Sequence, residues 1–384
     1  MSPVYPVTQY VPRPGVLDLG WGHPRPDLLP VEAWLDATRA ALAEHGWQAL
    51  TYGASPGPGP LLEWLAGHLT TVDGPCREDE LFVTGGASQA LALAGAVLIR
   101  PGDVVLVDAP TYHLAFAVLR DLGATLVSVP ADAEGPDPEA TAALAGRLRR
   151  AGRRVSALYL VPTFGNPTGR SLPARRRDDL LAAARRAAVT VIEDDTYREL
   201  AYDGAAPASL WSRGGGEGVV RLGSFAKTVA PGVRLGWLTA DRATVAAVAA
   251  RGWVNSGGGV NHTNALAMAA FGRSGAYARH TGHLRGEYRR QRNALAGALR
   301  AAAPALDVAV PHGGWFLWAG LPAGLTADAL LPVAERHGVS FVPGPQFHCD
   351  GAGGAGHVRL SYSMLPPVEL AEAARRLGAA LNRV

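Results

Sequence analysis

The stretch Gly223-Ser-Phe-Ala-Lys-Thr-Val-Ala-Pro-Gly-Val-Arg234 contains the single lysine of a 384-residue chain, whose 36 basic residues are otherwise all arginine. An arginine can replace a lysine on a solvated surface, but its guanidinium stays protonated near neutral pH and cannot attack a carbonyl carbon. A lysine can lose its proton and condense with a carbonyl group. Codon usage alone could also leave one lysine by accident. Whether Lys227 has a chemical role therefore depends on which residues accompany it.

Short β-branched runs alternate with helical patterns through the middle of the chain. We expect buried strands at 104–107, 158–161, 189–192, 219–222 and 235–238. Most of them are separated by stretches with apolar residues at helical spacing, such as 137–150 and 173–187. This alternation predicts an α/β fold with a mainly parallel, helix-covered sheet, in which ligands bind beyond the carboxyl ends of the strands.

The two ends of the chain have patterns of their own. The stretch 31–45 is typical of an amphipathic helix ended by Gly46, and a long helical pattern from about 279 to 303 leads into further strand and helix signals. We therefore expect three parts. An N-terminal arm and helix over 1–48 packs with the small domain, a large domain covers 49–280, and a small α+β domain covers 281–384.

Composition excludes several classes of protein. The arginines are scattered, the formal charge is only +3, and no basic stripe is interleaved with aromatic residues, so we expect no nucleic-acid partner. No apolar run approaches the ~18 residues of a membrane span, and the first residues do not resemble a signal peptide. Cys76 and Cys349 are too few for a disulfide framework, which suits the cytoplasm. His280 and His283 lack a third ligand, so we expect no metal site.

Two polar groups flank Lys227 at short range. Ser224 lies at the end of a predicted strand, and Arg234 follows a Pro-Gly turn; a hydroxyl and a guanidinium near an amine suit a phosphate. Upstream, Phe82-Val-Thr-Gly-Gly-Ala-Ser88 is typical of a strand, a glycine turn and the start of a helix. A helix N-terminus presents free N–H groups, so the turn 86–88 is expected to bind the same phosphate.

A second set of polar residues follows two other predicted strands. Asn166 lies in Pro162-Thr-Phe-Gly-Asn-Pro-Thr-Gly169, and Asp194 and Tyr197 lie in Glu193-Asp-Asp-Thr-Tyr197. A carboxylate at the end of a buried strand can keep a pyridine nitrogen protonated, while Asn and Tyr donors can bind a ring oxygen. Together with the amine and the phosphate site, these groups point to pyridoxal 5′-phosphate.

These motifs, in this order over nearly the whole chain, resemble the fold-type-I enzymes that use pyridoxal 5′-phosphate, specifically the class I/II aminotransferases. The resemblance implies that Lys227 forms the Schiff base with the cofactor and then carries a proton to and from the substrate. It also implies that Asp194 pairs with the pyridine nitrogen and that Tyr197 and Asn166 bind the ring 3-oxygen. The reaction would move an α-amino group from an amino acid to a 2-oxo acid.

The same resemblance assigns the remaining parts of the site. Tyr112 would stack on the ring, and the phosphate would be held by Gly86, Ala87, Ser88, Ser224 and Arg234. Arg359, in His357-Val-Arg-Leu-Ser-Tyr362, would bind the substrate α-carboxylate, with Asn166 and the loop of Trp21 and Gly22 beside it. Tyr52 matches a tyrosine that reaches the phosphate of the neighbouring subunit, which implies a homodimer with shared active sites.

Some positions depart from the family pattern without removing a chemical role. They are Asp108, Gly165, Thr196 and Ala226. Gly165 and the glycine-rich loop 255–261 touch regions that shape substrate choice. No arginine in that loop is evident for a distal carboxylate, and we expect Trp21, Trp315 and Phe316 to supply an aromatic wall, so an acidic side chain is not favoured.

Two other functions compete with transamination. The same cofactor and fold also carry out elimination, cyclisation of S-adenosylmethionine, oxidation or decarboxylation in specialised metabolism, depending on how the substrate is oriented. Some transcription factors carry this fold as an effector domain behind a DNA-binding module. The aminotransferase-like segment begins here within the first ~20 residues, so we expect an enzyme and not a regulator.

Overall fold

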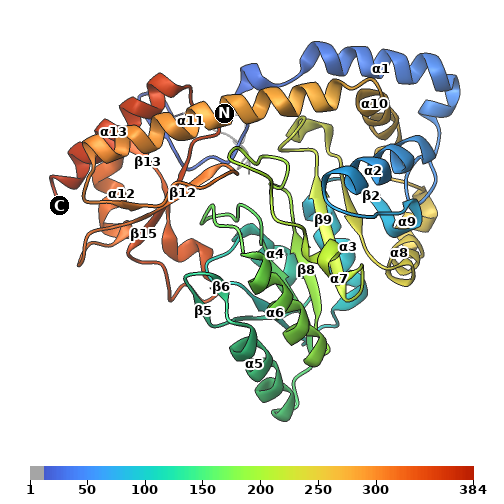
Figure 1. Ribbon diagram of the computed structural model, residues 1–384, viewed down its shortest axis with the longest axis horizontal. Helices are drawn as coiled ribbons and strands as arrows, with labels where there is room; N and C mark the ends of the chain where they lie inside the picture. The colour runs from blue at the N-terminus through green and yellow to red at the C-terminus, as the bar shows by residue number, and fades with distance from the viewer. Residues whose placement is uncertain (1–12) are drawn as a thin grey trace, which may run out of the picture.

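The computed structural model describes residues 13–384, and a seven-stranded sheet forms its centre (Figure 1). The strand order is β2-β10-β9-β8-β7-β3-β4, and neighbours from β9 to β4 pair in parallel, whereas β10 is antiparallel to both β9 and β2. The strands are β2 (Leu81–Thr84), β3 (Val104–Val107), β4 (Thr125–Ser128), β7 (Val155–Leu160), β8 (Thr190–Asp194), β9 (Val219–Ser224) and β10 (Gly236–Thr239). The expected mainly parallel α/β sheet is confirmed.

Helices cover both faces of this sheet, because alternate strand residues point to opposite sides. Val105, Tyr159 and Ile192 pack with α3 (Ala87–Leu98), α4 (Leu114–Asp121) and α8 (Arg242–Ala249). Their sequence neighbours Leu106, Leu158 and Val191 pack on the other face with α5 (Pro138–Arg150), α6 (Ala174–Arg186) and α7 (Leu210–Gly214). The strands are therefore apolar on both sides, which is why they appear in the sequence as continuous β-branched runs.

A third apolar cluster lies at the β2 end of the sheet. It joins α2 (Gly59–Val72) and α10 (His262–Arg273) to α1 (Val31–His45). The segment η2 (Gly46–Leu50) follows α1, and α9 (Gly252–Gly257) precedes α10. Gly46 has φ 55°, a conformation that L-residues adopt at a cost, and it ends α1 where the sequence predicted.

The C-terminal part is built on a four-stranded antiparallel sheet in the order β11-β12-β15-β14. Its strands are β11 (Asp307–Val308), β12 (Phe316–Gly320), β14 (Val342–Pro343) and β15 (His357–Ser361), and it packs with α12 (Ala327–Arg336) and α13 (Pro367–Leu381). The N-terminal strand β1 (Leu17–Asp18) pairs in parallel with β13 (Val339–Ser340), so residues from both ends of the chain meet here.

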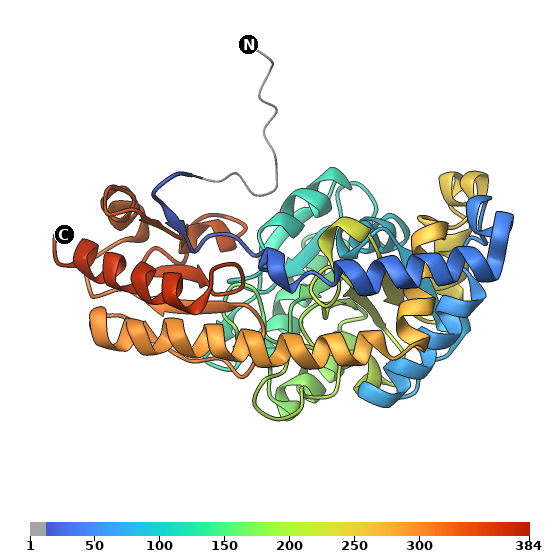
Figure 2. The ribbon, with the colours of Figure 1, turned by 90° about the horizontal axis from the view of Figure 1, so that it is seen from above.

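The long helix α11 (Ala276–Ala302) runs from the C-terminal part to the large sheet, and in Figure 2 it lies lengthwise along the molecule, as α1 does. Although α11 has 27 residues, it carries many charges; no helix within residues 13–384 combines the length and apolarity that a membrane span requires. The small remaining elements are β5 (Ala131–Asp132), β6 (Gly135–Pro136), η1 (Pro26–Leu28), η3 (Glu78–Glu80), η4 (Pro231–Val233) and η5 (Gly344–Phe347).

The predicted element ranges agree closely with the observed ones. The strand 104–107 and the helix 31–45 coincide with β3 and α1. Three strands differ by two residues or more at one end: β7 begins at Val155, three residues before the predicted start, and β8 and β9 continue two residues past the predicted end, to Asp194 and Ser224. The small or polar residues Ser156, Gly223 and Ser224 weaken the apolar pattern at the ends of β7 and β9. Gly223 and Ser224 still pair with β10, and Ser156 lies at an irregularity in the pairing of β7 with β3.

Candidate active site

The carboxyl ends of β3, β7, β8 and β9 meet at one edge of the large sheet, where a cavity of about 470 Å³ opens. Most residues assigned to the site from the sequence line this cavity. They are Trp21, Gly22, Ala87, Ser88, Tyr112, Asn166, Asp194, Tyr197, Ser224, Lys227, Arg234 and Arg359. Parallel pairing explains the convergence, because it brings the ends of strands that are distant in the sequence to a common edge.

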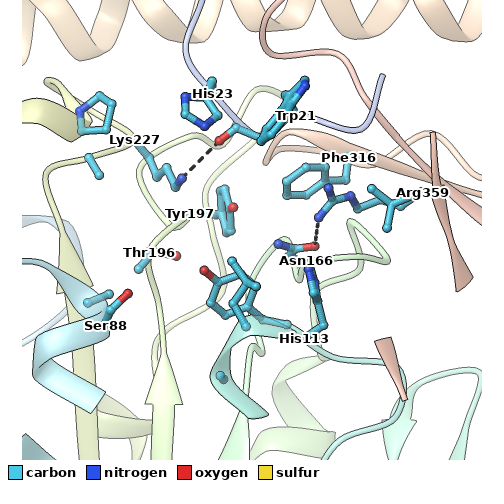
Figure 3. Close-up of a pocket in the computed structure, with 18 of the residues that line it drawn as sticks. Trp21, His23, Ser88, His113, Asn166, Thr196, Tyr197, Lys227, Phe316 and Arg359 are labelled. Atoms are coloured by element: carbon cyan, nitrogen blue, oxygen red, sulfur yellow. Dashed lines mark hydrogen bonds between the residues drawn. The ribbon is translucent and has the colours of Figure 1, made fainter. Parts of the chain in front are cut away.

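Lys227 lies three residues beyond the end of β9 and extends toward the N-terminal loop (Figure 3). Its Nζ is 3.4 Å from the carbonyl oxygen of Gly22 and 4.6 Å from the ring centroid of Trp315. Burial lowers the pKa of this amine to about 8, with smaller contributions from Arg359 and Arg234, while Asp194 acts in the opposite direction. The only lysine is therefore easier to deprotonate than a lysine on the surface.

The phosphate-binding candidates are brought together by the register of three strands. Gly236 of β10 pairs with Thr84 of β2 on one side and with Ser224 of β9 on the other. The turn after β2 bends at Gly86, which has φ 104°, and α3 begins at the next residue. Arg234 donates from Nη2 to the carbonyl oxygen of Gly85 at 2.7 Å. The N-terminus of α3, a hydroxyl and a guanidinium thus share one corner, which suits a phosphate dianion.

The conformation of Arg234 is held by the loop before α10. Arg234 adopts φ 49°, and the side-chain amide of Asn261 donates to the carbonyl oxygens of Val233 (2.6 Å) and Arg234 (2.9 Å). The loop 255–261 thus has a contact with the phosphate corner that the sequence did not predict.

Asp194, the last residue of β8, has one carboxylate oxygen occupied and one free. Oδ2 accepts a hydrogen bond from Tyr159 at 2.8 Å, whereas Oδ1 is buried and has no partner among residues 13–384. Burial raises the pKa of the carboxyl group, and the hydrogen bond from Tyr159, together with contacts of the carboxylate with the hydroxyl and backbone N–H of Thr196, opposes this. A buried acceptor without a donor is costly. A protonated pyridine nitrogen would satisfy it, so the residues present fit the cofactor.

The carboxylates on both sides of Asp194 belong to a buried network of opposite charges. Asp195 is paired with Arg198 at 2.5 Å and with Arg221 at 2.9 Å, and both arginines also pair with Asp73. Glu193 pairs with Arg177 at 3.7 Å and also accepts from the backbone N–H groups that begin α7. All these side chains are nearly inaccessible to solvent. The network compensates the charge next to Asp194.

Arg359 enters the cavity from β15, on the opposite side from Lys227 (Figure 3). Its Nη1 donates to Oδ1 of Asn166 at 2.9 Å, and its Nη2 donates to the carbonyl oxygen of Gly20 at 2.5 Å. The guanidinium lies 4.3 Å from the ring centroid of Phe316. A buried, oriented guanidinium of this kind can bind a carboxylate with both nitrogens.

The three aromatic side chains expected in the cavity wall do not all lie there. Trp315 is fully buried and does not line the cavity, so the expectation that it forms part of the wall is wrong. Its ring packs under Lys227, in contact with the rings of Tyr197 and Tyr288. Its position in the turn before β12 directs the ring into the core. Phe316 does line the cavity, beneath Arg359, and so does Trp21.

Tyr52 and Asn255 do not line the cavity of their own chain. Tyr52 is 84% exposed, and Trp47 and Leu50 next to it are exposed at 76% and 72%. Gly86 forms the turn beneath Arg234 and is likewise absent from the lining. A Cβ atom on Gly86 would meet Nη2 of Arg234 at 3.0 Å, so a glycine here lets the guanidinium approach the turn.

Sequence reasoning missed several residues of the site. It predicts Tyr159 only as part of a strand and gives no role to His23 and His113, although both histidines line the cavity. Burial lowers the pKa of His113 to about 4, and burial together with Lys227 lowers the pKa of His23. A signal did exist for Arg221, because a charged residue inside the apolar run Val219-Val-Arg-Leu222 requires a buried partner.

Comparison with known proteins agrees with this geometry. The family model described as aminotransferase class I and II matches residues 14–377. A 2-aminoadipate transaminase of Thermus thermophilus is 35% identical, with 96% of this chain and 91% of that protein covered. An aromatic-amino-acid aminotransferase of Thermococcus litoralis is 31% identical, with 98% and 90% covered.

A solved structure shows the same fold. It is the crystal structure of LysN, an alpha-aminoadipate aminotransferase from Thermus thermophilus, complexed with N-(5′-phosphopyridoxyl)-L-leucine. LysN superposes on this chain with a TM-score of 0.84 at 35% sequence identity, and the match covers 96% of this chain and 93% of LysN. The named relatives favour transamination over elimination, cyclisation, oxidation or decarboxylation. The chain belongs to the aminotransferase class I and II family and is an aminotransferase that uses pyridoxal 5′-phosphate.

Proposed function

We propose that Lys227 is the residue that forms the imine in this aminotransferase and that it also moves the substrate proton. The observation that carries the proposal is the position of the chain's one ε-amine, which extends into the cavity between the phosphate corner and Arg359. Its lowered pKa makes the neutral, nucleophilic form accessible near neutral pH.

The other residues would hold the cofactor and the substrate in fixed positions. Gly86, Ala87, Ser88, Ser224 and Arg234 bind the phosphate, and Tyr112 lies against the ring. Asp194 accepts a hydrogen bond at its free Oδ1, while Tyr197 and Asn166 donate to a ring oxygen. When bound, pyridoxal 5′-phosphate supplies an aldehyde for imine formation and a conjugated ring that withdraws electrons from the substrate α-carbon.

Arg359 binds the α-carboxylate of the amino acid and fixes the orientation of the α-carbon. Nζ of Lys227 removes the α-proton, and the same amine can return a proton once the C–H bond is broken. The Trp315 ring beneath Nζ keeps water from that side and stabilises the protonated amine. Asn166, Gly22 and Trp21 complete the substrate site.

The proposal is tested by one half-reaction. Holoenzyme mixed with a reactive amino acid and no oxo acid should convert stoichiometrically to pyridoxamine phosphate and release one 2-oxo acid per site. Lys227→Ala should not do so, and Lys227→Arg serves as the control that keeps the charge. Release of ammonia, carbon dioxide or hydrogen peroxide in place of pyridoxamine phosphate would contradict the proposal.

We also propose that the chain works as a homodimer in the cytoplasm, with Tyr52 reaching the partner's phosphate. The exposed side chains of Trp47, Leu50 and Tyr52 support this, because large apolar side chains that stay exposed close together in the chain favour an interface. Two free cysteines, Cys76 and Cys349, suit a reducing compartment. The division into parts at 48 and 280 remains a proposal as well.

Subunit mixing tests the shared site. Tyr52→Ala and Lys227→Ala variants, each of low activity, are unfolded and refolded together. A mixed dimer has one intact site, so an equimolar mixture should regain about one quarter of the parent activity. Recovery no greater than the sum of the two variants refolded separately would contradict a shared site.

A further inference from the structure

The cavity contains four lysine or arginine side chains, and three of them already have a role in the proposed function. Lys227 carries the amine, Arg234 lies at the phosphate corner and Arg359 faces the α-carboxylate. The fourth, Arg13, comes from another part of the chain, just before β1, whereas Lys227 and Arg234 follow β9 and Arg359 belongs to β15. A substrate with a second carboxylate needs a cation at the far end of the cavity, so the state of Arg13 bears on substrate choice.

Arg13 is engaged by two carboxylates of its own chain. Its Nη2 is 2.6 Å from Oδ2 of Asp18, and its Nη1 is 2.6 Å from Oε1 of Glu335. Asp18 also accepts from the backbone N–H of Gly20, and Glu335 accepts from the hydroxyl of Ser340. We name the group Arg13, Asp18 and Glu335 the distal triad. Its formal charge is −1, because one guanidinium faces two carboxylates.

No other described group supplies a positive charge for a distal carboxylate. His23 and His113 line the cavity, but their lowered pKa values keep both imidazoles neutral near pH 7. The residues before Arg13 include no lysine, arginine or histidine. A carboxylate beside the distal triad would therefore meet a net negative charge without a free counterion, a repulsion that water partly screens because Arg13 and Glu335 are each 40% exposed.

Apolar side chains form a further part of the lining. Leu91 comes from α3, Leu114 and Val118 come from α4, Phe341 lies between β13 and β14, and Val342 begins β14. Trp21 adds an aromatic ring on the side of the N-terminal loop (Figure 3). An apolar surface of this kind favours a large apolar side chain, because burying that side chain removes its surface from water.

We propose that this enzyme selects amino acids with a large uncharged side chain, aromatic or aliphatic, and that the distal triad rejects substrates with a distal carboxylate. The inference rests on the proposed function, because it takes Arg359 as the group that binds the α-carboxylate. The same cavity receives amino acids and oxo acids, so the selection applies to both.

Half-reactions of the holoenzyme test the selection directly. L-phenylalanine and L-leucine are compared with L-2-aminoadipate and L-glutamate in single-turnover experiments, and kcat/KM is taken for each. We expect the uncharged substrates to exceed the acidic ones by about 100-fold or more. Comparable or higher values for L-2-aminoadipate or L-glutamate would overturn the inference. Absence of reaction with every amino acid would instead contradict the proposed function.

A second experiment changes the triad itself. The double variant Asp18→Asn, Glu335→Gln releases the Arg13 guanidinium without changing the size of the side chains. The ratio of kcat/KM for L-2-aminoadipate to that for L-phenylalanine should rise by about 10-fold or more. Adding Arg13→Met should remove this rise. A matched control is Asp178→Asn, which breaks the surface ion pair with Arg213 and should leave the ratio unchanged. A ratio that stays constant in the double variant would also overturn the inference.

Discussion

The buried network behind Asp194 gives the strongest prediction for stability. Arg221 is 2% exposed and pairs with Asp73 and Asp195, each at 2.9 Å and each at most 1% exposed. Arg221→Met keeps most of the side-chain volume but leaves both carboxylates to Arg198 alone. Removing one partner from a buried ion pair costs about 3–5 kcal/mol, because the remaining charge is desolvated and uncompensated.

The chain offers a control that differs mainly in exposure. Arg273 pairs with Glu44 at 2.6 Å, but these side chains are 41% and 47% exposed. Arg273→Met should cost at most about 1 kcal/mol, since water screens a surface pair. Guanidinium unfolding followed by tryptophan fluorescence, at equal protein concentrations, compares the two variants with the parent.

A double variant separates lost charge pairing from lost packing. Asp73→Asn in the Arg221→Met background removes one of the stranded carboxylates, so the two changes together should cost about 1–3 kcal/mol less than their sum. If Arg221→Met destabilised the protein no more than Arg273→Met, the network would not contribute as described, and the reasoning would be refuted.

Two further predictions concern the amine and the carboxylate of the site. Burial lowers the pKa of Lys227 to about 8, so the fraction of neutral amine increases as pH rises through 8. The rate at which the cofactor-free protein captures pyridoxal 5′-phosphate, followed by stopped-flow absorbance, should therefore rise roughly 90-fold from pH 6 to pH 9. A midpoint near pH 10 in this rate profile would contradict the prediction. Tyr159→Phe removes the hydrogen bond to Oδ2 of Asp194 and should raise the dissociation constant of the cofactor about tenfold or more, as measured by equilibrium titration. Tyr288→Phe is the control, because the Tyr288 hydroxyl is buried without a partner among the described residues and its removal should change the dissociation constant little. Equal effects of the two variants would argue against a role for Tyr159.

Local sequence patterns were enough to predict most of the fold. The runs at 104–107 and 158–161 are apolar on both faces of the sheet, and helices with clear periodicity separate the strands. The candidate site was also predictable in outline, because Asp194, Asn166 and Lys227 each follow a strand, and parallel strands place such residues at one edge.

The contacts that could not be predicted join residues far apart in the sequence. Arg221 and Asp73 are separated by 148 positions, and Arg13 and Glu335 by 322. Spacing along the chain carries no information on such pairs, since they depend on how the two ends of the chain pack. Trp315 illustrates the same point, because sequence alone does not say whether an aromatic residue next to a strand faces the cavity or the core.

The central claim is that Lys227 alone forms the imine with the cofactor, and chemical trapping tests it most directly. Borohydride reduction of the holoenzyme should add one phosphopyridoxyl group per chain, as measured by intact mass. Because Lys227 is the only lysine, digestion with a lysine-specific protease should cut the untreated chain at that residue alone and fail to cut the reduced one. A reduced adduct that remains in Lys227→Ala, or cleavage after residue 227 in the fully labelled protein, would contradict the claim.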